Sequence, residues 1–391
     1  MQNRWLILFV LFLARTAMAF QFQSVGALSP LLIDSLALSL VEVGLLIGLY
    51  LGPGIIVGML GGAVAAWFGD KRTVIASLLL MILGSVMIAY AAGLTGLIAG
   101  RIVSGIGGVV INVVMTKLVI DWFAGASMAT AMSLFISSWP LGIAASLLIL
   151  PTLAGVGGLG AAWLASTAIS VVALALFLLV YQAPPGAVVR VRGLKSVALP
   201  MRPLVLSSVT WGIFNTGIAM VFGFGPLVLT GRGLSATDAS SITSLYMLTL
   251  TLATLFGGWI GDRLGGRDGL VLGCLVVSAI LFPALIYAPV GLLPLLFGIT
   301  GVLAGLIAGP IAALPSLFLA PEARAFGMGI YFSIYYGLMM AAPPIAGALA
   351  EGLGEISVAF GLGSGMMVVT LIGLLWFRQV VASAAAEQIK M

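Results

Sequence analysis

The chain of 391 residues contains no histidine, one cysteine and few charged residues. A single cysteine cannot build a disulfide framework, and Cys274 lies in an apolar run where packing is its default role. Charged residues make up 7% of the sequence, and only 11 residues are Asp or Glu. None of these acids lies in the interior of a long apolar run, so proton transfer through buried histidine or carboxylate groups is disfavoured.

Motifs of enzymes and of ATP-driven proteins are also missing. The sequence has no nucleotide-binding loop, no cluster of metal ligands and no nucleophile paired with a base. It therefore predicts neither an enzyme nor a cofactor. A carrier of cationic drugs would be expected to hold an acid within an apolar run, and this chain offers none there.

Apolar residues, by contrast, are abundant. They make up 62% of the chain, and the mean hydropathy is +1.27, more than a soluble domain could bury. Runs of about 20 apolar residues recur, each long enough to cross a hydrocarbon core about 30 Å thick. The sequence thus predicts an all-α membrane protein with twelve transmembrane helices, at residues 5–27, 42–66, 73–93, 95–118, 128–150, 159–181, 203–228, 239–261, 269–289, 291–318, 326–350 and 357–379.

The first apolar run also resembles a signal peptide, because Arg4 precedes it and the small residues Ala17 and Ala19 imitate a cleavage site. Cleavage there would remove half of a helix and leave eleven spans. The apolar character continues to Ile33, and twelve spans suit an internal duplication. We therefore interpret this run as the first span.

The positions of Lys and Arg predict the orientation, since cationic loops stay on the cytoplasmic side. Only Arg232 falls on the outer side, so both termini are expected on the cytoplasmic side. The expected location is the bacterial inner (plasma) membrane. The net charge of +5 is then a topology signal, and no nucleic-acid partner is expected. The cytoplasmic cations are Arg4, Lys71, Arg72, Arg190, Arg192, Lys195, Arg202, Arg263, Arg267, Arg324, Arg378 and Lys390.

A polar segment divides the chain into two halves. Residues 183–202 carry Pro, Gly and basic residues and read as a cytoplasmic linker. The Gly pair that ends at Gly62 is repeated in the pair that ends at Gly258. We expect two pseudo-symmetric six-helix bundles, 1–182 and 203–391, that rock about a central site.

The turn that follows Gly258 carries a specific motif. It contains Asp262, Arg263, Gly265 and Arg267, with the spacing of the Gly-x-x-x-Asp-Arg-x-Gly-Arg-Arg signature of the major facilitator superfamily. The chain resembles that family, which implies a rocking transporter in which this turn acts as a coupling or gating element. An Asp and an Arg at the ends of adjacent helices can form a charge-assisted latch.

The first-half copy of the turn, from Gly62 to Gly69, departs from the pattern. Ala66 stands where the acid is expected and Trp67 where the first base is expected, so this latch is weak or absent. A second family signature resembles the stretch from Arg101 to Gly108. A third, weaker one resembles Pro343, Pro344 and Gly347.

Within the superfamily, the first half is similar to the cyanate and nitroimidazole transporter group. The likeness lies in Ser24, Gly26 and Pro30, and in the Gly105-x-Gly107 motif followed by Asn112, while the nitrate-porter signature is missing. This resemblance implies a small planar anion as cargo.

Three cations lie inside apolar runs, where a charge usually faces a cavity. Arg15 lies roughly 15 Å from the start of its span, near the midplane, and is the leading candidate for binding an anion. The alternative is a structural Arg bonded to carbonyls of a neighbouring helix. Arg101 is assigned to coupling or scaffold, with direct anion contact left open. Lys117 is a candidate ligand, with snorkelling or pairing with Asp121 as the alternative.

Polar and aromatic residues from both halves complete the predicted site. They would supply hydrogen bonds and ring walls, while the first half supplies charge. The predicted lining is Arg15, Gln21, Asn112, Lys117, Trp211, Asn215, Tyr246, Tyr331 and Tyr335, with Thr216, Thr249, Ser333 and Tyr336 as further candidates.

The sequence predicts a transporter of a small anion that acts by alternating access, without a cofactor, as a monomer in the lipid bilayer. Exchange or facilitated diffusion suits the absence of buried acids. The alternatives are an exporter of neutral or lipophilic compounds, with Arg15 structural, and a non-transporting sensor or scaffold. No loop is long enough for the signalling domain that a sensor needs.

Overall fold

The computed structural model describes residues 4–58, 67–123, 127–182, 199–264, 267–319 and 324–390, and these ranges are helical and contain no strand. The α-helices are α1 (Arg4–Leu36), α2 (Leu40–Leu49), α4 (Asp70–Ala89), α5 (Leu94–Phe123), α6 (Met128–Val180), α7 (Met201–Gly231), α8 (Ala236–Leu264), α9 (Arg267–Tyr287), α10 (Leu293–Ala312), α11 (Arg324–Leu353) and α12 (Val358–Lys390). Two 3₁₀ turns, η1 (Val290–Leu292) and η2 (Leu314–Leu317), flank α10.

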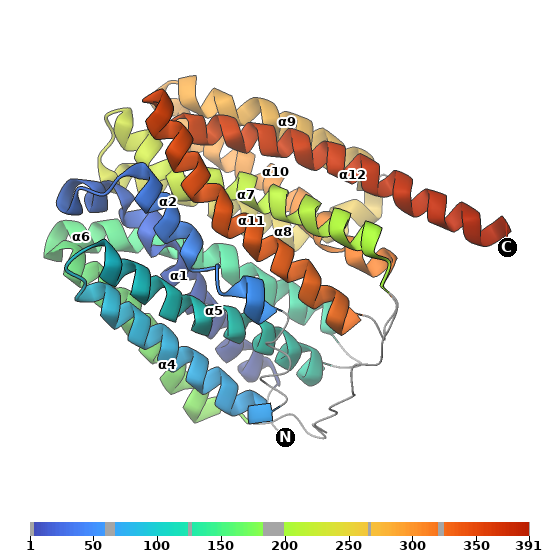
Figure 1. Ribbon diagram of the computed structural model, residues 1–391, viewed down its shortest axis with the longest axis horizontal. Coiled ribbons are helices and arrows are strands. Elements are labelled where there is room, and N and C mark those ends of the chain that lie inside the picture. Colours follow the sequence, from blue (N-terminus) through green and yellow to red (C-terminus); the bar gives the residue numbers. More distant parts are fainter. Residues whose placement is uncertain are drawn as a thin grey trace.

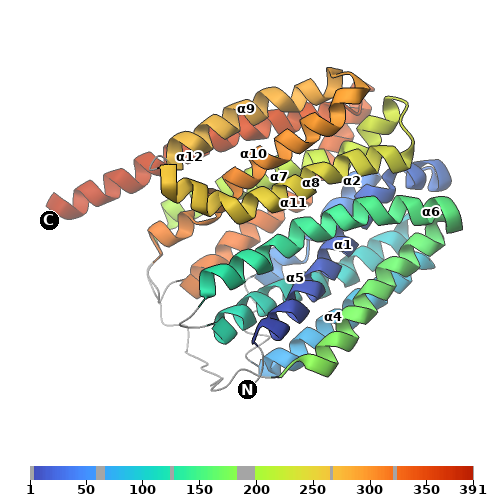
Figure 2. The same ribbon diagram turned by 180° about the vertical axis from the view of Figure 1, so that it is seen from behind.

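The predicted membrane architecture is confirmed. Ten stretches of the described residues are long and apolar enough to cross a membrane. One of these, α6, is two helices joined at Gly158, whose φ of 72° lies in the left-handed region. Figure 2 shows α6 turning back on itself, so it crosses twice. Counting α6 twice gives eleven such spans among the described residues, and α8, which packs along α10, stands at the place of the remaining predicted span.

The helices form two groups that lie side by side (Figure 1). In the first group α1 packs on α6 and α4 packs on α5, while in the second α8 packs on α10 and α7 on α12. Both termini lie at the same end of the molecule. The predicted linker lies largely outside the described residues, so its boundaries stay a prediction.

The main contacts between the two groups are those of α1 with α7, α2 with α11, and α6 with α8. The contact between α2 and α11 depends on glycine. A Cβ on Gly44 would collide with the backbone carbonyl of Pro343, and one on Gly347 with the carbonyl of Leu40. The third predicted signature, Pro343 to Gly347, therefore forms part of the interface between the two groups.

Prolines inside the helices leave backbone carbonyls free to accept hydrogen bonds from polar side chains. Proline has no N–H, so the carbonyl four residues earlier loses its helical donor. Pro226 frees the carbonyl of Phe222 in α7, and Gln23 of α1 donates its Nε2–H to that oxygen at 2.8 Å. A side chain of one group thus satisfies a carbonyl of the other, as a low-dielectric environment requires.

Candidate functional site: a central cavity with one arginine

A cavity of about 140 Å³ lies between the two groups of helices. Side chains from both groups line it, and most of its walls are apolar or aromatic. Among the described residues of this lining, Arg15 is the one charged side chain. The lining residues are Arg15, Met18, Leu51, Asn112, Ile136, Trp139, Pro140, Trp211, Phe214, Asn215, Ile218, Phe222, Met247, Leu250, Thr254, Ala308, Phe332, Tyr335 and Tyr336.

Arg15 reaches from α1 to a break in the hydrogen bonding of α6. Pro140 leaves the carbonyl of Ile136 without its helical donor, and Arg15 Nη1 donates to that oxygen at 3.1 Å. The same nitrogen donates to the carbonyl of Phe135 at 2.8 Å. The guanidinium carbon lies 4.7 Å from the centroid of the Phe135 ring, a cation–π distance. The structural contacts that the sequence left as an alternative are therefore present.

These contacts do not use the whole guanidinium. Arg15 Nε donates to Asn112 Oδ1 at 2.9 Å, and Nη1 is taken by the two carbonyls. Within the described residues, Nη2 makes no hydrogen bond. Because Arg15 is partly exposed and lines the cavity, this nitrogen can bind a ligand while the others hold the side chain in place.

Asn112 links Arg15 to the other group of helices. Its Nδ2–H donates to the hydroxyl of Tyr336 on α11 at 3.2 Å. Tyr336, a further lining candidate from the sequence, lines the cavity beside Tyr335. Adjacent residues on a helix point about 100° apart, yet both tyrosines reach the cavity.

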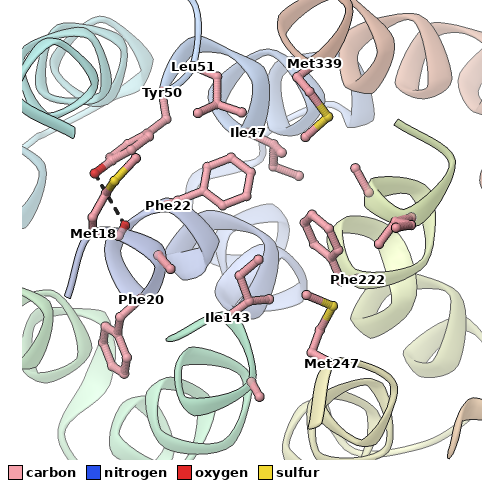
Figure 3. Packing of buried hydrophobic residues seen from close by; sticks show 14 of the residues in the cluster. Met18, Phe20, Phe22, Ile47, Tyr50, Leu51, Ile143, Phe222, Met247 and Met339 are labelled. Carbon is pink, nitrogen blue, oxygen red and sulfur yellow. Dashed lines mark hydrogen bonds between the residues drawn. The ribbon is translucent and has the colours of Figure 1, made fainter. Parts of the chain in front are cut away.

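An aromatic cluster lies beside the cavity and includes the lining residues Trp139 and Phe222. Phe22 of α1 stacks on Trp139 of α6 with ring centroids 5.1 Å apart, and meets Phe222 of α7 edge to face at 6.1 Å. Figure 3 shows the ring of Phe22 beside Ile47, with Phe222, Leu51 and further apolar side chains nearby. This aromatic cluster adjoins the interhelical hydrogen bond from Gln23 to the carbonyl of Phe222.

Five of the nine predicted lining residues meet at this cavity: Arg15, Asn112, Trp211, Asn215 and Tyr335. Gln21 lies elsewhere: it is buried, donates to the carbonyl of Met81 and accepts from the Tyr50 hydroxyl. Tyr246 and Tyr331 are also buried away from the cavity, and their hydroxyls have no hydrogen-bond partner among the described residues.

Lys117 also lies outside the cavity lining. Its Nζ is 2.6 Å from Asp70 and 3.2 Å from Asp121, and about half of its side chain is exposed. The contact with Asp121 is the i,i+4 pairing that the sequence left open. Asp70 stands at the start of α4, so Lys117 joins the ends of α4 and α5.

Arg101 is fully buried and does not line the cavity. It donates to the carbonyls of Leu46, Gln21 and Phe22 at 2.8, 2.9 and 2.8 Å, and its guanidinium lies over the Tyr50 ring. Leu46 belongs to the last turn of α2, whose carbonyls have no helical donor, so Arg101 satisfies them. This placement matches the scaffold interpretation.

The glycines after Arg101 bring α5 close to its neighbours. A Cβ on Gly105 would collide with the carbonyl of Tyr50, and one on Gly107 with the carbonyl of Ser77. Small residues that allow backbones to approach are typical of helix contacts in membranes.

Most of the predicted turn motifs fall outside the described side chains. Gly62 and Gly265 lie outside the described residues. The backbones of Gly258, Asp262 and Arg263 belong to α8 and that of Arg267 begins α9, but their side chains are likewise outside the described set. Gly69 is described: it precedes α4 with a φ of 82°, a conformation that favours glycine.

Long apolar helices in two groups around a shared cavity are typical of a membrane transport protein of the two-bundle type. Comparison with known families agrees with this class. The model of the Major Facilitator Superfamily matches residues 7–235 and 212–389, nearly the whole sequence. The chain belongs to this superfamily.

Curated relatives are transporters as well. The chain is 27% identical over 336 residues to the 3-(3-hydroxy-phenyl)propionate transporter of Escherichia coli, covering 80% of this chain and 79% of that protein. It is 22% identical over 302 residues to the hexuronate transporter of Bacillus subtilis, covering 70% and 71%.

Solved structures share the fold. The nucleoside transporter NupG superposes with a TM-score of 0.76 at 14% identity, covering 96% of this chain and 99% of that one. A bacterial homolog of the human lysosomal transporter Spinster superposes with a TM-score of 0.71 at 16% identity, covering 97% and 96%.

Proposed function

We propose that this protein carries a small organic monoanion across the membrane and that Arg15 binds the anion. The observation that carries the proposal is the free Nη2 of Arg15, the one charged side chain in the described cavity lining. A cation between largely apolar walls attracts a counter-ion strongly, because little screens it there. Guanidinium N–H groups form charge-assisted hydrogen bonds with carboxylates.

Two relatives support an anionic cargo. Hexuronate and 3-(3-hydroxyphenyl)propionate are both carboxylates, and each is the cargo named for a protein that aligns with most of this chain. The described cavity lining contains no acid that would suit a cation. An anionic substrate therefore agrees with both the relatives and the charge of the site.

The size of the cavity and the side chains that line it limit which substrates can fit. A protein cavity of about 150 Å³ accommodates benzene, and this cavity measures about 140 Å³. Trp139, Trp211, Phe214 and Phe332 offer ring faces and edges that suit a flat molecule. We therefore expect a carboxylate with at most one ring, or a smaller planar anion such as cyanate.

In the transport cycle we propose, residues 1–182 rock against residues 203–391, so that the cavity opens alternately to the two sides of the membrane. The protein lies in a bacterial inner membrane with both termini on the cytoplasmic side. The protein acts as a monomer. Enclosing an unpaired guanidinium in a closed state is unfavourable, and a bound anion removes that penalty. The loaded protein should therefore change state faster than the empty one, so anion exchange should exceed net uptake.

Uptake of radiolabelled benzoate and cyanate into proteoliposomes tests the proposal. We compare the wild type with Arg15→Gln and Arg15→Lys, and use Lys117→Gln as the matched control, because Lys117 is a cation outside the cavity. We expect Arg15→Gln to lose at least about 90% of uptake, because a charge-assisted contact is worth about 1.5–3 kcal/mol. Arg15→Lys should retain part of it, and Lys117→Gln should keep the wild-type substrate preference.

Thermal unfolding in detergent separates loss of function from loss of fold. A folded Arg15→Gln that takes up every tested anion like the wild type would reject the role of Arg15. If the wild type moved only neutral lipophilic compounds, the exporter alternative would replace the anion carrier.

A further inference from the structure

We propose that Tyr336 of α11 is a second anion-binding group, which meets Arg15 from the opposite bundle, and that Asn112 is the positioning residue for both. The inference rests on the proposed function, because it adds residues to the same site. Three helices supply the three side chains: α1 carries Arg15, α5 carries Asn112 and α11 carries Tyr336.

The hydrogen bonds around Asn112 have only one chemically consistent direction. Arginine has donors alone, so the amide oxygen of Asn112 must face Arg15 Nε, at 2.9 Å. The amide nitrogen must then face Tyr336, at 3.2 Å, and the phenol oxygen must accept. The side chain of Asn112 therefore orients a guanidinium on one side and a phenol on the other.

This direction leaves the proton of the Tyr336 hydroxyl available. A phenol can accept and donate at once, and within the described residues this hydroxyl donates to nothing. Tyr336 lines the cavity together with Arg15. Two donors, Arg15 Nη2–H and Tyr336 O–H, therefore converge on one cavity from opposite bundles, and a carboxylate has two oxygens to accept from them.

Tyr336 is also held firmly enough to act as a ligand. The residue is only 2% exposed, and its ring packs on the backbone at Gly54, after the end of α2, where an added Cβ would overlap the ring. The rings of Phe332 and Tyr335 lie 6.2 Å and 5.0 Å away. A donor fixed in this way needs little reorganisation when an anion arrives.

The arrangement connects binding to the contact between the bundles. An anion held by Arg15 and Tyr336 would tie α1 to α11, in addition to the hydrogen bond from Asn112 to Tyr336. The substrate would thereby stabilise the state in which these helices are close. A ligand shifts a conformational equilibrium only through such differential contacts.

The test compares Tyr336→Phe with Tyr331→Phe, using benzoate binding to purified protein and benzoate uptake into proteoliposomes. Both changes remove one hydroxyl from α11, but Tyr331 lies outside the cavity and its hydroxyl has no partner among the described residues. A hydrogen bond to a charged group predicts about 10- to 100-fold weaker benzoate binding for Tyr336→Phe and no change for Tyr331→Phe.

The positioning role of Asn112 is tested by a double-mutant cycle. If Asn112 acts through Tyr336, the fold loss of benzoate affinity in the double mutant Asn112→Ala/Tyr336→Phe should be smaller than the product of the fold losses in the two single mutants. Independent, multiplicative effects would overturn the positioning role. Wild-type benzoate affinity in Tyr336→Phe would overturn the whole inference, while loss of uptake in Arg15→Gln would leave the proposed function intact.

Discussion

Asn112→Asp is the substitution that probes the charge of the site most directly. The two side chains have the same shape, so the carboxylate would stand where Asn112 Oδ1 now lies, 2.9 Å from Arg15 Nε. It would form an ion pair with the guanidinium and remove the attraction for a second anion. The Tyr336 hydroxyl would also turn toward the new carboxylate, because its oxygen would lose the amide donor.

The magnitude follows from Coulomb's law. Two unit charges about 4 Å apart interact with about 4 kcal/mol at an effective dielectric constant of 20. A bound anion beside Arg15 would lose most of this attraction, because the Asp would repel it over a similar distance. Each 1.4 kcal/mol is about a tenfold change in affinity, so we expect binding to weaken at least about 100-fold.

Benzoate binding to the purified protein, measured by calorimetry, is the assay, and thermal unfolding reports on the fold. The matched control is the same substitution in an Arg15→Gln background, where the introduced carboxylate has no cation to neutralise. There the carboxylate still repels an anion, so any residual benzoate binding should weaken further and should not recover. If Asn112→Asp bound benzoate as tightly as the wild type while remaining folded, an anion site at Arg15 would be refuted.

Two further predictions concern the scaffold. Arg101→Lys should lower the melting temperature in detergent, because an ammonium cannot donate to three separated carbonyls as the planar guanidinium does. Breaking a buried charged network costs about 3–5 kcal/mol, so an unchanged melting temperature would contradict the scaffold role. Gly44→Ala should reduce the yield of folded protein, measured by size-exclusion chromatography, because its Cβ would collide with the Pro343 carbonyl. Gly337→Ala is the control on the facing helix, since its Cβ would lie 3.9 Å from the nearest atom, and equal yields would count against the close α2–α11 contact.

Sequence reasoning recovered the architecture because the bilayer imposes a simple rule. Each span needs about 20 apolar residues and must satisfy its backbone internally, so hydropathy alone predicted twelve helices. The joint at Gly158 and the turn at Gly69 likewise follow from a residue type that tolerates positive φ. Arg15 was identifiable for a similar reason, since a charge deep in an apolar run is expensive and seldom incidental.

The partners of the buried polar groups required the tertiary structure. Arg15 and Arg101 look alike in the sequence, as cations within apolar runs, yet one lines a cavity and the other binds helix-end carbonyls. Arg15 binds the carbonyl that Pro140 frees in α6, and Arg101 binds a carbonyl in the last turn of α2. Where those carbonyls lie depends on how the helices pack. Sequence periodicity gives the face of a helix but not its neighbour, so the hydrogen bond between Asn112 and Tyr336 could be found only once α5 and α11 were placed together.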